Sequence, residues 1–152
     1  MAKFAAQGVV ARYGAAVGTS LPTPALDTFT DIGQIVSISG PSITKGQIEV
    51  TTFDDAAKTF LSDLSEPGTL DFTILLDTAL TDHGVLFGDV SAQGRTRNFQ
   101  LELPDTGALT TPTEINFVGE VLSWSPSFEQ GSAISVELSV QVSGAVSQTA
   151  RA

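Results

Sequence analysis

Strict alternation of apolar and polar residues over 134–142 is the sequence feature that most constrains the fold. A β-strand sends successive side chains to opposite faces, so this period of two predicts a half-buried strand. The apolar positions of this segment are Ile134, Val136, Leu138, Val140 and Val142, and the polar ones are Ser135, Glu137, Ser139 and Gln141.

Further segments repeat this pattern and predict about six strands with antiparallel connections. Strands are predicted over 69–77, 97–105 and 113–124, and two more over 32–39 and 47–52 flank a predicted turn at 40–46. Gly119 indicates a bulge or a close backbone approach, and Pro126 is expected to end its strand. The apolar faces of the first three strands carry Leu70, Phe72, Ile74 and Leu76; Phe99, Leu101 and Leu103; and Ile115, Phe117, Gly119 and Val121.

Composition supports the same fold class and excludes several functions. Charged residues make up 16% of the 152 residues, and Gly, Ser and Thr are abundant, which is typical of an all-β domain with short strands and turns. A single domain over 1–152 is therefore expected. The chain contains no cysteine, which excludes disulfides and thiolate metal sites, and it has no apolar run long enough for a membrane span. We interpret the opening residues as mature sequence.

Two segments depart from the alternating pattern. Over 54–64, an acidic cap at Asp54 or Asp55 could begin a helix with Ala57, Phe60, Leu61 and Leu64 on one face. Over 77–94, near-helical spacing predicts a helix packed on one sheet face, with Leu80, Leu86, Phe87 and Val90 as its apolar residues. Residues 1–30 show no sustained period and are expected to form an extended N-terminal arm.

The order of these features resembles the tail tube proteins of long-tailed, siphophage-like bacteriophages, the major tail protein family. The similarity extends over about 31–144 and includes the run EVTTFDD at 49–55, the dipeptide PG at 67–68, an RNF strand ending in PD at 97–105, and a last alternating strand ending at Gly144. Each motif alone has low specificity, but the order of the motifs along the chain is similar to that of the family.

This resemblance implies a mainly β fold, an antiparallel β-sandwich or barrel with one short α-helix, and a structural role in the virion without enzymatic activity or cofactor. It implies assembly in the host cytoplasm into stacked hexameric rings around a channel for DNA. The tape measure, tail terminator and baseplate proteins would be its partners, with no membrane involved. Two alternatives stay open: a tube protein of a contractile-injection or secretion system, and a free-standing β-sandwich binding module.

The charge of the chain agrees with a DNA channel. Seventeen acidic and seven basic residues give a net charge of -10, which disfavours wrapping around nucleic acid but suits a wall past which DNA slides without specific binding. The candidate lumen acids lie on predicted strands: Glu49, Asp71, Glu102, Glu120 and Glu137. A solvated sheet face that aids solubility would explain each of them equally well.

Two segments are candidates for contacts between subunits. The acidic excursion at 51–68 is longer than a hairpin needs, so we predict a loop that docks on a neighbouring ring. Its contact residues would be Phe53, Asp54, Asp55, Phe60 and Leu61. The alternative is a short helix folded on its own sheet. The N-terminal arm would make similar contacts through Phe4, Val9, Val10 and Tyr13, unless it is a disordered terminus.

Catalytic and metal-binding patterns find little support. His83 is the single histidine, and beside Asp82 it is interpreted as a surface or loop residue. Asp54 and Asp55 are adjacent and therefore point to different sides, which favours capping over a paired acid site. Trp124 could offer a carbohydrate platform, but a core or subunit-interface role is preferred.

Overall fold

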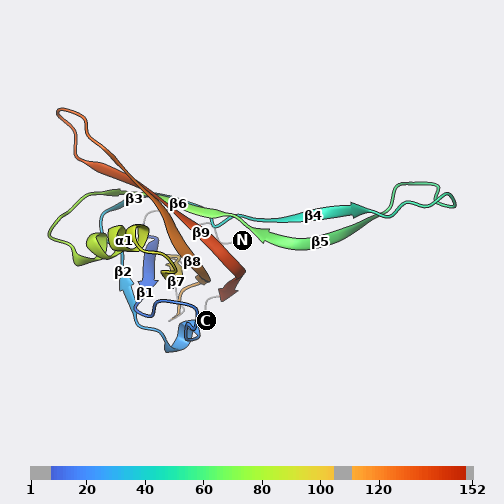
Figure 1. Cartoon of the computed structure of the whole chain (residues 1–152), viewed down its shortest axis with the longest axis horizontal. Coiled ribbons are helices and arrows are strands. Elements are labelled where there is room, and N and C mark those ends of the chain that lie inside the picture. The colour runs from blue at the N-terminus through green and yellow to red at the C-terminus, as the bar shows by residue number, and fades with distance from the viewer. Residues whose placement is uncertain (1–7, 105–110, 150–152) are drawn as a thin grey trace.

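The computed structural model describes residues 8–104 and 111–149, which form a mainly antiparallel β-fold with one α-helix (Figure 1). The strands are β1 (Val10–Gly14), β2 (Phe29–Asp31), β3 (Ile35–Ser39), β4 (Ile43–Glu49), β5 (Phe60–Pro67), β6 (Thr69–Leu75), β7 (Thr96–Glu102), β8 (Glu114–Ser127) and β9 (Ser135–Thr149). The helix α1 spans Thr81–Ser91, and a single 3-10 turn, η1, spans Pro24–Leu26.

Seven strands form one open sheet in the order β2-β1-β7-β8-β9-β6-β3. The long strands β8 and β9 belong to both halves of it, because β7 pairs with β8 over 114–120 and β6 pairs with β9 over 135–141. Two register shifts in β8, at 116–118 and 121–123, mark bulges that bend the strand. The sheet is therefore not a closed barrel, and its two halves are consistent with a sandwich.

The core lies between these halves and is closed by α1. Phe99 and Phe117 stack with ring centroids 5.7 Å apart, and α1, which packs against β8, contributes Leu86. A Cβ at Gly119 would meet Val140 Cγ1 at 2.7 Å, which confirms the predicted close approach. The other buried apolar residues are Ala11, Tyr13, Ile32, Leu70, Phe72, Ile74, Leu101, Val121, Val136, Leu138, Val140 and Val142.

Most of the predicted elements are confirmed. The strands predicted over 69–77, 97–105, 113–124 and 134–142 correspond to β6, β7, β8 and β9, and the helix predicted within 77–94 is α1. The expectation that Pro126 ends its strand is wrong, because Pro126 lies within β8 opposite Val136. Beyond residue 120, β8 has a neighbour on one side, and proline is tolerated on such an edge.

The predicted turn at 40–46 and the helix over 54–64 are both wrong. β3 pairs with β6, and β4 pairs with β5 in a separate two-stranded hairpin that leaves the sandwich (Figure 1). A register shift between Lys45 and Gln47 interrupts the alternation of this hairpin. The resulting spacing of Phe60, Leu61 and Leu64 imitates a helical face, although these residues lie on β5.

The expectation of an N-terminal arm over 1–30 is also corrected within the described residues. β1 lies inside the sheet between β2 and β7. The segment between β1 and β2 is tied to β7, because Asn98 Nδ2 donates to Pro22 O at 3.0 Å and to Asp27 Oδ2 at 2.9 Å. Residues 10–31 therefore belong to the sandwich. Residues 1–7 lie outside the described part.

Candidate assembly surfaces

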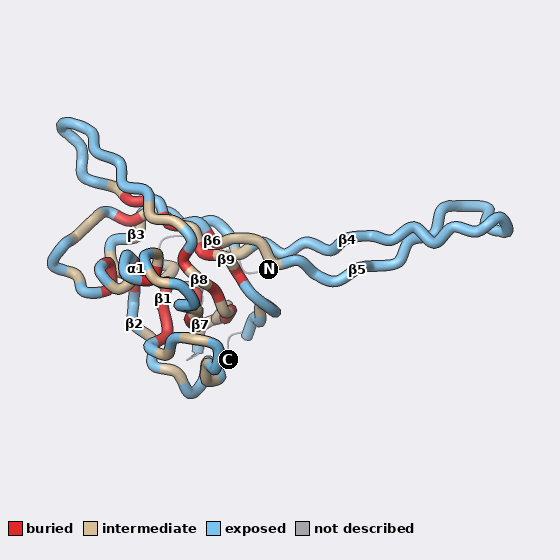
Figure 2. The backbone as a smooth tube through the Cα atoms, in the orientation of Figure 1, coloured by how far each residue is buried: buried red, intermediate tan, exposed pale blue. Residues whose placement is uncertain are grey.

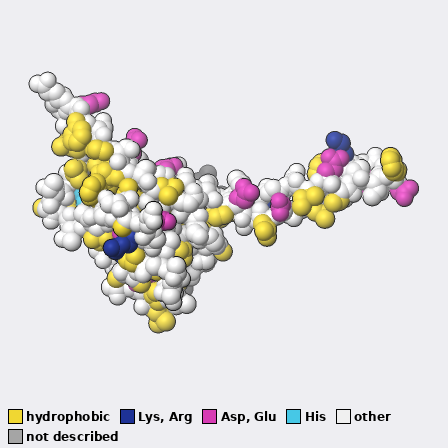
Figure 3. Space-filling view, in the orientation of Figure 1, with side chains coloured by type: hydrophobic (Ala, Val, Ile, Leu, Met, Phe, Trp, Pro, Cys, Tyr) yellow, Lys and Arg dark blue, Asp and Glu magenta, His cyan; other side chains and the backbone are white. Residues whose placement is uncertain are grey.

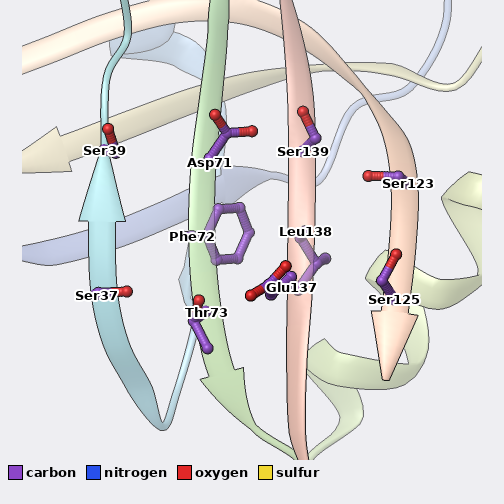
Figure 4. A pocket seen from close by; sticks show the side chains of 10 residues that line it. All are labelled: Ser37, Ser39, Asp71, Phe72, Thr73, Ser123, Ser125, Glu137, Leu138 and Ser139. Carbon is purple, nitrogen blue, oxygen red and sulfur yellow. The ribbon is translucent and has the colours of Figure 1, made fainter. Parts of the chain in front are cut away.

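The outer face of strands β3, β6, β9 and β8 is lined by hydroxyls and carboxylates (Figure 4). Asp71 pairs with Ser39 on one side and Ser139 on the other, while Glu137 pairs with Thr73 and Ser125. The ten residues that line the cleft on this face are Ser37, Ser39, Asp71, Phe72, Thr73, Ser123, Ser125, Glu137, Leu138 and Ser139, with no Lys or Arg among them. We call this surface the acidic face.

The structure brings three of the five candidate lumen acids together and separates the other two. Asp71 and Glu137 share the acidic face, and Glu120, opposite Gln141 on β9, continues it. Glu102 instead accepts a hydrogen bond from Arg12 on β1. Glu49 lies at the end of β4, 4.0 Å from Lys58 Nζ.

The part of the sheet that carries the acidic face ends in two strand edges without a partner in the described chain. β3 pairs with β6 alone, and β8 beyond Glu120 pairs with β9 alone. Unpaired N–H and C=O groups on such edges are a template for another strand. The same strands thus present both a polar face and two edges that can join to other chains.

The β4–β5 hairpin is the second candidate surface. It projects from the sandwich, and Figure 2 shows it exposed along almost its whole length. An isolated two-stranded hairpin is at best marginally stable in water, so this one gains from a partner. Figure 3 shows hydrophobic side chains along the surface of the hairpin. Its exposed apolar residues include Ile43, Ile48, Val50, Phe53, Phe60, Leu61 and Leu64.

A hydrogen-bonded turn shapes the tip of the hairpin. Asp55 Oδ2 accepts from Thr52 N at 2.7 Å and from Thr52 Oγ1 at 3.2 Å, and Asp55 N donates to Thr52 O. Asp55 is thus a turn residue and not a helix cap. Between these two residues, Phe53 is fully exposed at 110% of its reference area, and Asp54 is also exposed.

The N-terminal candidates fall into three groups. Tyr13 is buried in the core of its own chain, which contradicts its expected contact with another subunit. It lies there because alternation along β1 turns Ala11 and Tyr13 inward. Val9 and Val10 are half-buried, and Phe4 lies outside the described residues.

Buried polar groups, which the sequence patterns did not single out, fix the elements behind these surfaces. Arg97 donates to Asp89 through Nε at 2.6 Å and Nη2 at 3.1 Å, which joins β7 to α1. Arg97 also donates to Gly14 O at 2.9 Å and covers the Tyr13 ring. The sequence does contain a signal for this buried arginine, because Arg97 occupies the apolar face of its strand two residues before Phe99.

His83 is buried, which contradicts its interpretation as a surface or loop residue. Its Nδ1 accepts a hydrogen bond from Asp77 N at 3.1 Å, and its Nε2 lies 2.9 Å from Gly33 O. Asp82 Oδ2 accepts from Gly33 N at 2.8 Å. Together these bonds hold the start of α1 against the connection between β2 and β3.

Other features of the described residues define no site for chemistry. The described residues contain no cluster of three or more metal-ligating side chains. Trp124 packs edge-to-face on Phe87, with centroids 5.5 Å apart, at the border of the core. Within the described ranges, no helix has the length and apolar character needed to cross a bilayer.

Comparison with known proteins identifies the family. The family model described as phage tail tube, TTP, lambda-like, matches residues 18–152. The chain belongs to this family. It is therefore a phage tail tube protein and a structural component of the virion tail. No curated protein sequence matches it.

Solved structures agree with this fold. The tail tube of SPP1 is 11% identical with a TM-score of 0.70, and the match covers 97% of this chain and 80% of that chain. The tail of an empty GTA particle, computed with C6 symmetry, is 18% identical with a TM-score of 0.68, over 97% and 100% of the two chains. The PVC sheath-tube complex of an extracellular contractile injection system is 15% identical with a TM-score of 0.72, over 97% and 92%.

Proposed function

We propose that this phage tail tube protein is the major tube subunit, which polymerises into stacked hexameric rings whose channel conducts DNA. Its role is structural and not enzymatic. The observation that carries the proposal is the acidic face, which lies on a part of the sheet with two free edges. The tape measure, tail terminator and baseplate proteins are its proposed partners at and inside the tube, on the basis of family resemblance.

Within a ring, β3 of one subunit would pair with the free part of β8 in the next. Closing the ring satisfies both edges of every subunit and leaves none exposed, which removes the risk of uncontrolled pairing. The four-stranded parts would then form one continuous wall. Six copies per ring are proposed from family resemblance, and the sixfold symmetry of the GTA tail supports that number.

The acidic face would line the channel. Asp71, Glu120 and Glu137 place negative charge there, and the lining residues contribute no cation. Repulsion over a screening length of about 8–10 Å keeps a DNA polyanion away from a narrow wall at physiological salt. The hydroxyls of the remaining residues keep the wall polar without adding positive charge, so DNA can slide without specific binding.

The segment at 51–68 and the chain start would join neighbouring subunits. Phe53 and Phe60 are the proposed anchors of the hairpin on the next ring, together with Leu61, Asp54 and Asp55. Their exposure supports this role, because docking would bury apolar area that the sandwich of the same chain leaves open. Phe4, Val9 and Val10 are proposed to add contacts at the chain start.

Electron microscopy of the purified chain tests this function. We expect hollow tubes with sixfold symmetry. Val36 is 62% exposed on β3, so Val36→Lys should leave the monomer folded but block edge pairing and shorten or abolish tubes. Leu26→Lys, at an exposed site on η1, is the matched control and should assemble normally. A wild-type chain that stays monomeric at every concentration would refute the proposal.

A tube protein of a contractile-injection or secretion system is the second candidate. The fold shared with the PVC sheath-tube complex favours it, since one tube architecture can serve both kinds of particle. Imaging of particles that contain this chain separates the two candidates. A sheath around the tube would favour the second, and a bare tube the first.

A further inference from the structure

A surface hollow beside α1 has no occupant within the described chain. It lies between the β6–α1 connection, α1 and β8, and its volume is about 240 Å³. Phe87 and Trp124 form one wall in edge-to-face contact, and Phe87 is 54% exposed. The lining is mostly apolar and consists of Leu76, Asp77, Thr78, Leu80, His83, Gly84, Phe87 and Trp124. We call it the aromatic pocket.

We propose that the aromatic pocket receives Phe53 from the hairpin tip of a second copy of this chain. The inference rests on the proposed role of the hairpin between rings, and it adds the receptor site and the anchor residue. An aromatic side chain in a pocket lined by aromatic rings is the usual centre of an interface, where water is excluded and most of the binding energy resides.

Phe53 is prepared for this role by the turn that carries it. The Thr52–Asp55 hydrogen bonds fix the backbone around Phe53, so docking orders few additional dihedral angles. The ring itself touches little of its own chain, because it is fully exposed. Its burial is therefore gained in full when another surface covers it.

The placement of the two features requires a second molecule. The hairpin projects to one side of the sandwich, whereas α1 lies at the opposite side (Figure 1). On the side of α1, the connected ends of β8 and β9 also leave the sandwich (Figure 1). Figure 3 shows one cluster of hydrophobic side chains at the base of these ends, near α1, and a second cluster along the β4–β5 hairpin. A tip and a pocket on opposite sides join copies head to tail, and such contacts repeat along a polymer.

The sandwich also carries an exposed cation that can attract the acidic tip of a second copy. Of the three arginines in the described sandwich, Arg12 and Arg97 are paired with carboxylates, whereas exposed Arg95, four residues after α1, forms no ion pair. Asp54 at the hairpin tip is likewise exposed and unpaired there. The pocket's own carboxylate, on Asp77, accepts from Ala79 N at 2.9 Å. Arg95 is thus a cation of the sandwich that is available to the acidic tip of another copy.

Filling the pocket tests the inference without disturbing the core. A Cβ at Gly84 meets nothing within 4 Å, so Gly84→Leu should fold normally and occupy the pocket. We expect the critical concentration for tube assembly to rise about tenfold or more, as for loss of an interface anchor. Ser91→Leu is the control, because Ser91 is exposed at the last position of α1, about two turns from Gly84, and does not line the pocket. It should assemble like the wild type.

Cysteine crosslinking locates the contact directly, because the chain has no cysteine of its own. Tubes made from mixed Asp54→Cys and Gly84→Cys chains, which keep Phe53, should give crosslinked dimers with a short thiol-reactive crosslinker. A mixture of Asp54→Cys with Leu26→Cys should not. Arg95→Glu should weaken assembly, and adding Asp54→Arg to the same chain should restore it.

The outcomes separate this inference from the function on which it rests. Normal assembly of Gly84→Leu together with absent crosslinks from 54 to 84 would overturn the pocket assignment. If Phe53→Ser still abolished tubes in that case, the hairpin would keep its role with a different receptor. A wild-type chain that forms no tubes would remove the proposed function and this inference together.

Discussion

Tyr13 is the one tyrosine of the chain, and burial in the core followed by the charge of Asp82 raises its pKa above the ordinary value of about 10. The folded state therefore holds the phenol proton more tightly than the unfolded state. This contribution to stability is complete below the unfolded pKa and is lost as the pH rises through the folded pKa. Tyrosinate absorbance should titrate later in the native protein than in urea, and Tyr13→Phe should lose less stability across that range. Coincident titrations would contradict the expectation.

At the same scale, the Asp89–Arg97 pair should dominate the stability of the contact between α1 and β7. Asp89→Asn leaves a buried guanidinium without its counter-charge, so we expect a loss of about 3–5 kcal/mol in unfolding free energy. The exposed pair of Lys58 and Glu49 is the control, and Lys58→Ala should cost at most about 1 kcal/mol. Urea denaturation measures both. Equal losses in the two variants would show that the buried pair has no special weight.

Among the elements, the β4–β5 hairpin is expected to contribute to tube assembly but little to the stability of the folded monomer. Phe60 is 48% exposed on β5, so Phe60→Ala should change monomer stability by no more than about 0.5 kcal/mol while impairing tube formation. Phe72 is 3% exposed in the core, and Phe72→Ala should cost about 3–5 kcal/mol. Thermal melting and electron microscopy of both variants check this contrast. A strongly destabilised Phe60→Ala monomer would exclude the docking role.

Strands with an uninterrupted alternation of apolar and polar residues were predictable from the sequence. Strands whose alternation is broken, or whose partner strand lies far along the chain, were not. β6 and β9 show clean alternation because each has one face in the core. The strand predicted over 47–52 overlaps β4, but β5 was missed because a bulge opposite Gly46 breaks its period, and no core face marks it. β1 was missed because it is five residues long and its partner β7 lies far along the chain. Of the candidate acids, Asp71 and Glu137 could be named, but their shared face depends on the pairing of β6 with β9.

For the whole molecule, strand pairing decides which acidic residues share one face of the sheet and which lie beside cations of their own chain. Glu102 and Glu49 engage cations of their own chain, so they contribute little net charge to the surface. Asp71 and Glu137 have no basic neighbour on the acidic face. In a closed ring this difference decides which carboxylates DNA would meet. The position of an acidic residue on the sheet therefore matters more for the charge of the channel wall than the net charge of -10 of the whole chain.

The last prediction follows from that distinction. Glu137→Lys reverses a charge on the proposed channel wall, whereas Glu129→Lys makes the same change on the exposed connection between β8 and β9. Both variants should assemble, but Glu137→Lys should slow DNA release from virions because a cationic wall holds phosphates. The delay should shrink as salt is raised, since screening weakens this attraction. Equal release rates for the two variants would mean that the acidic face does not line the channel.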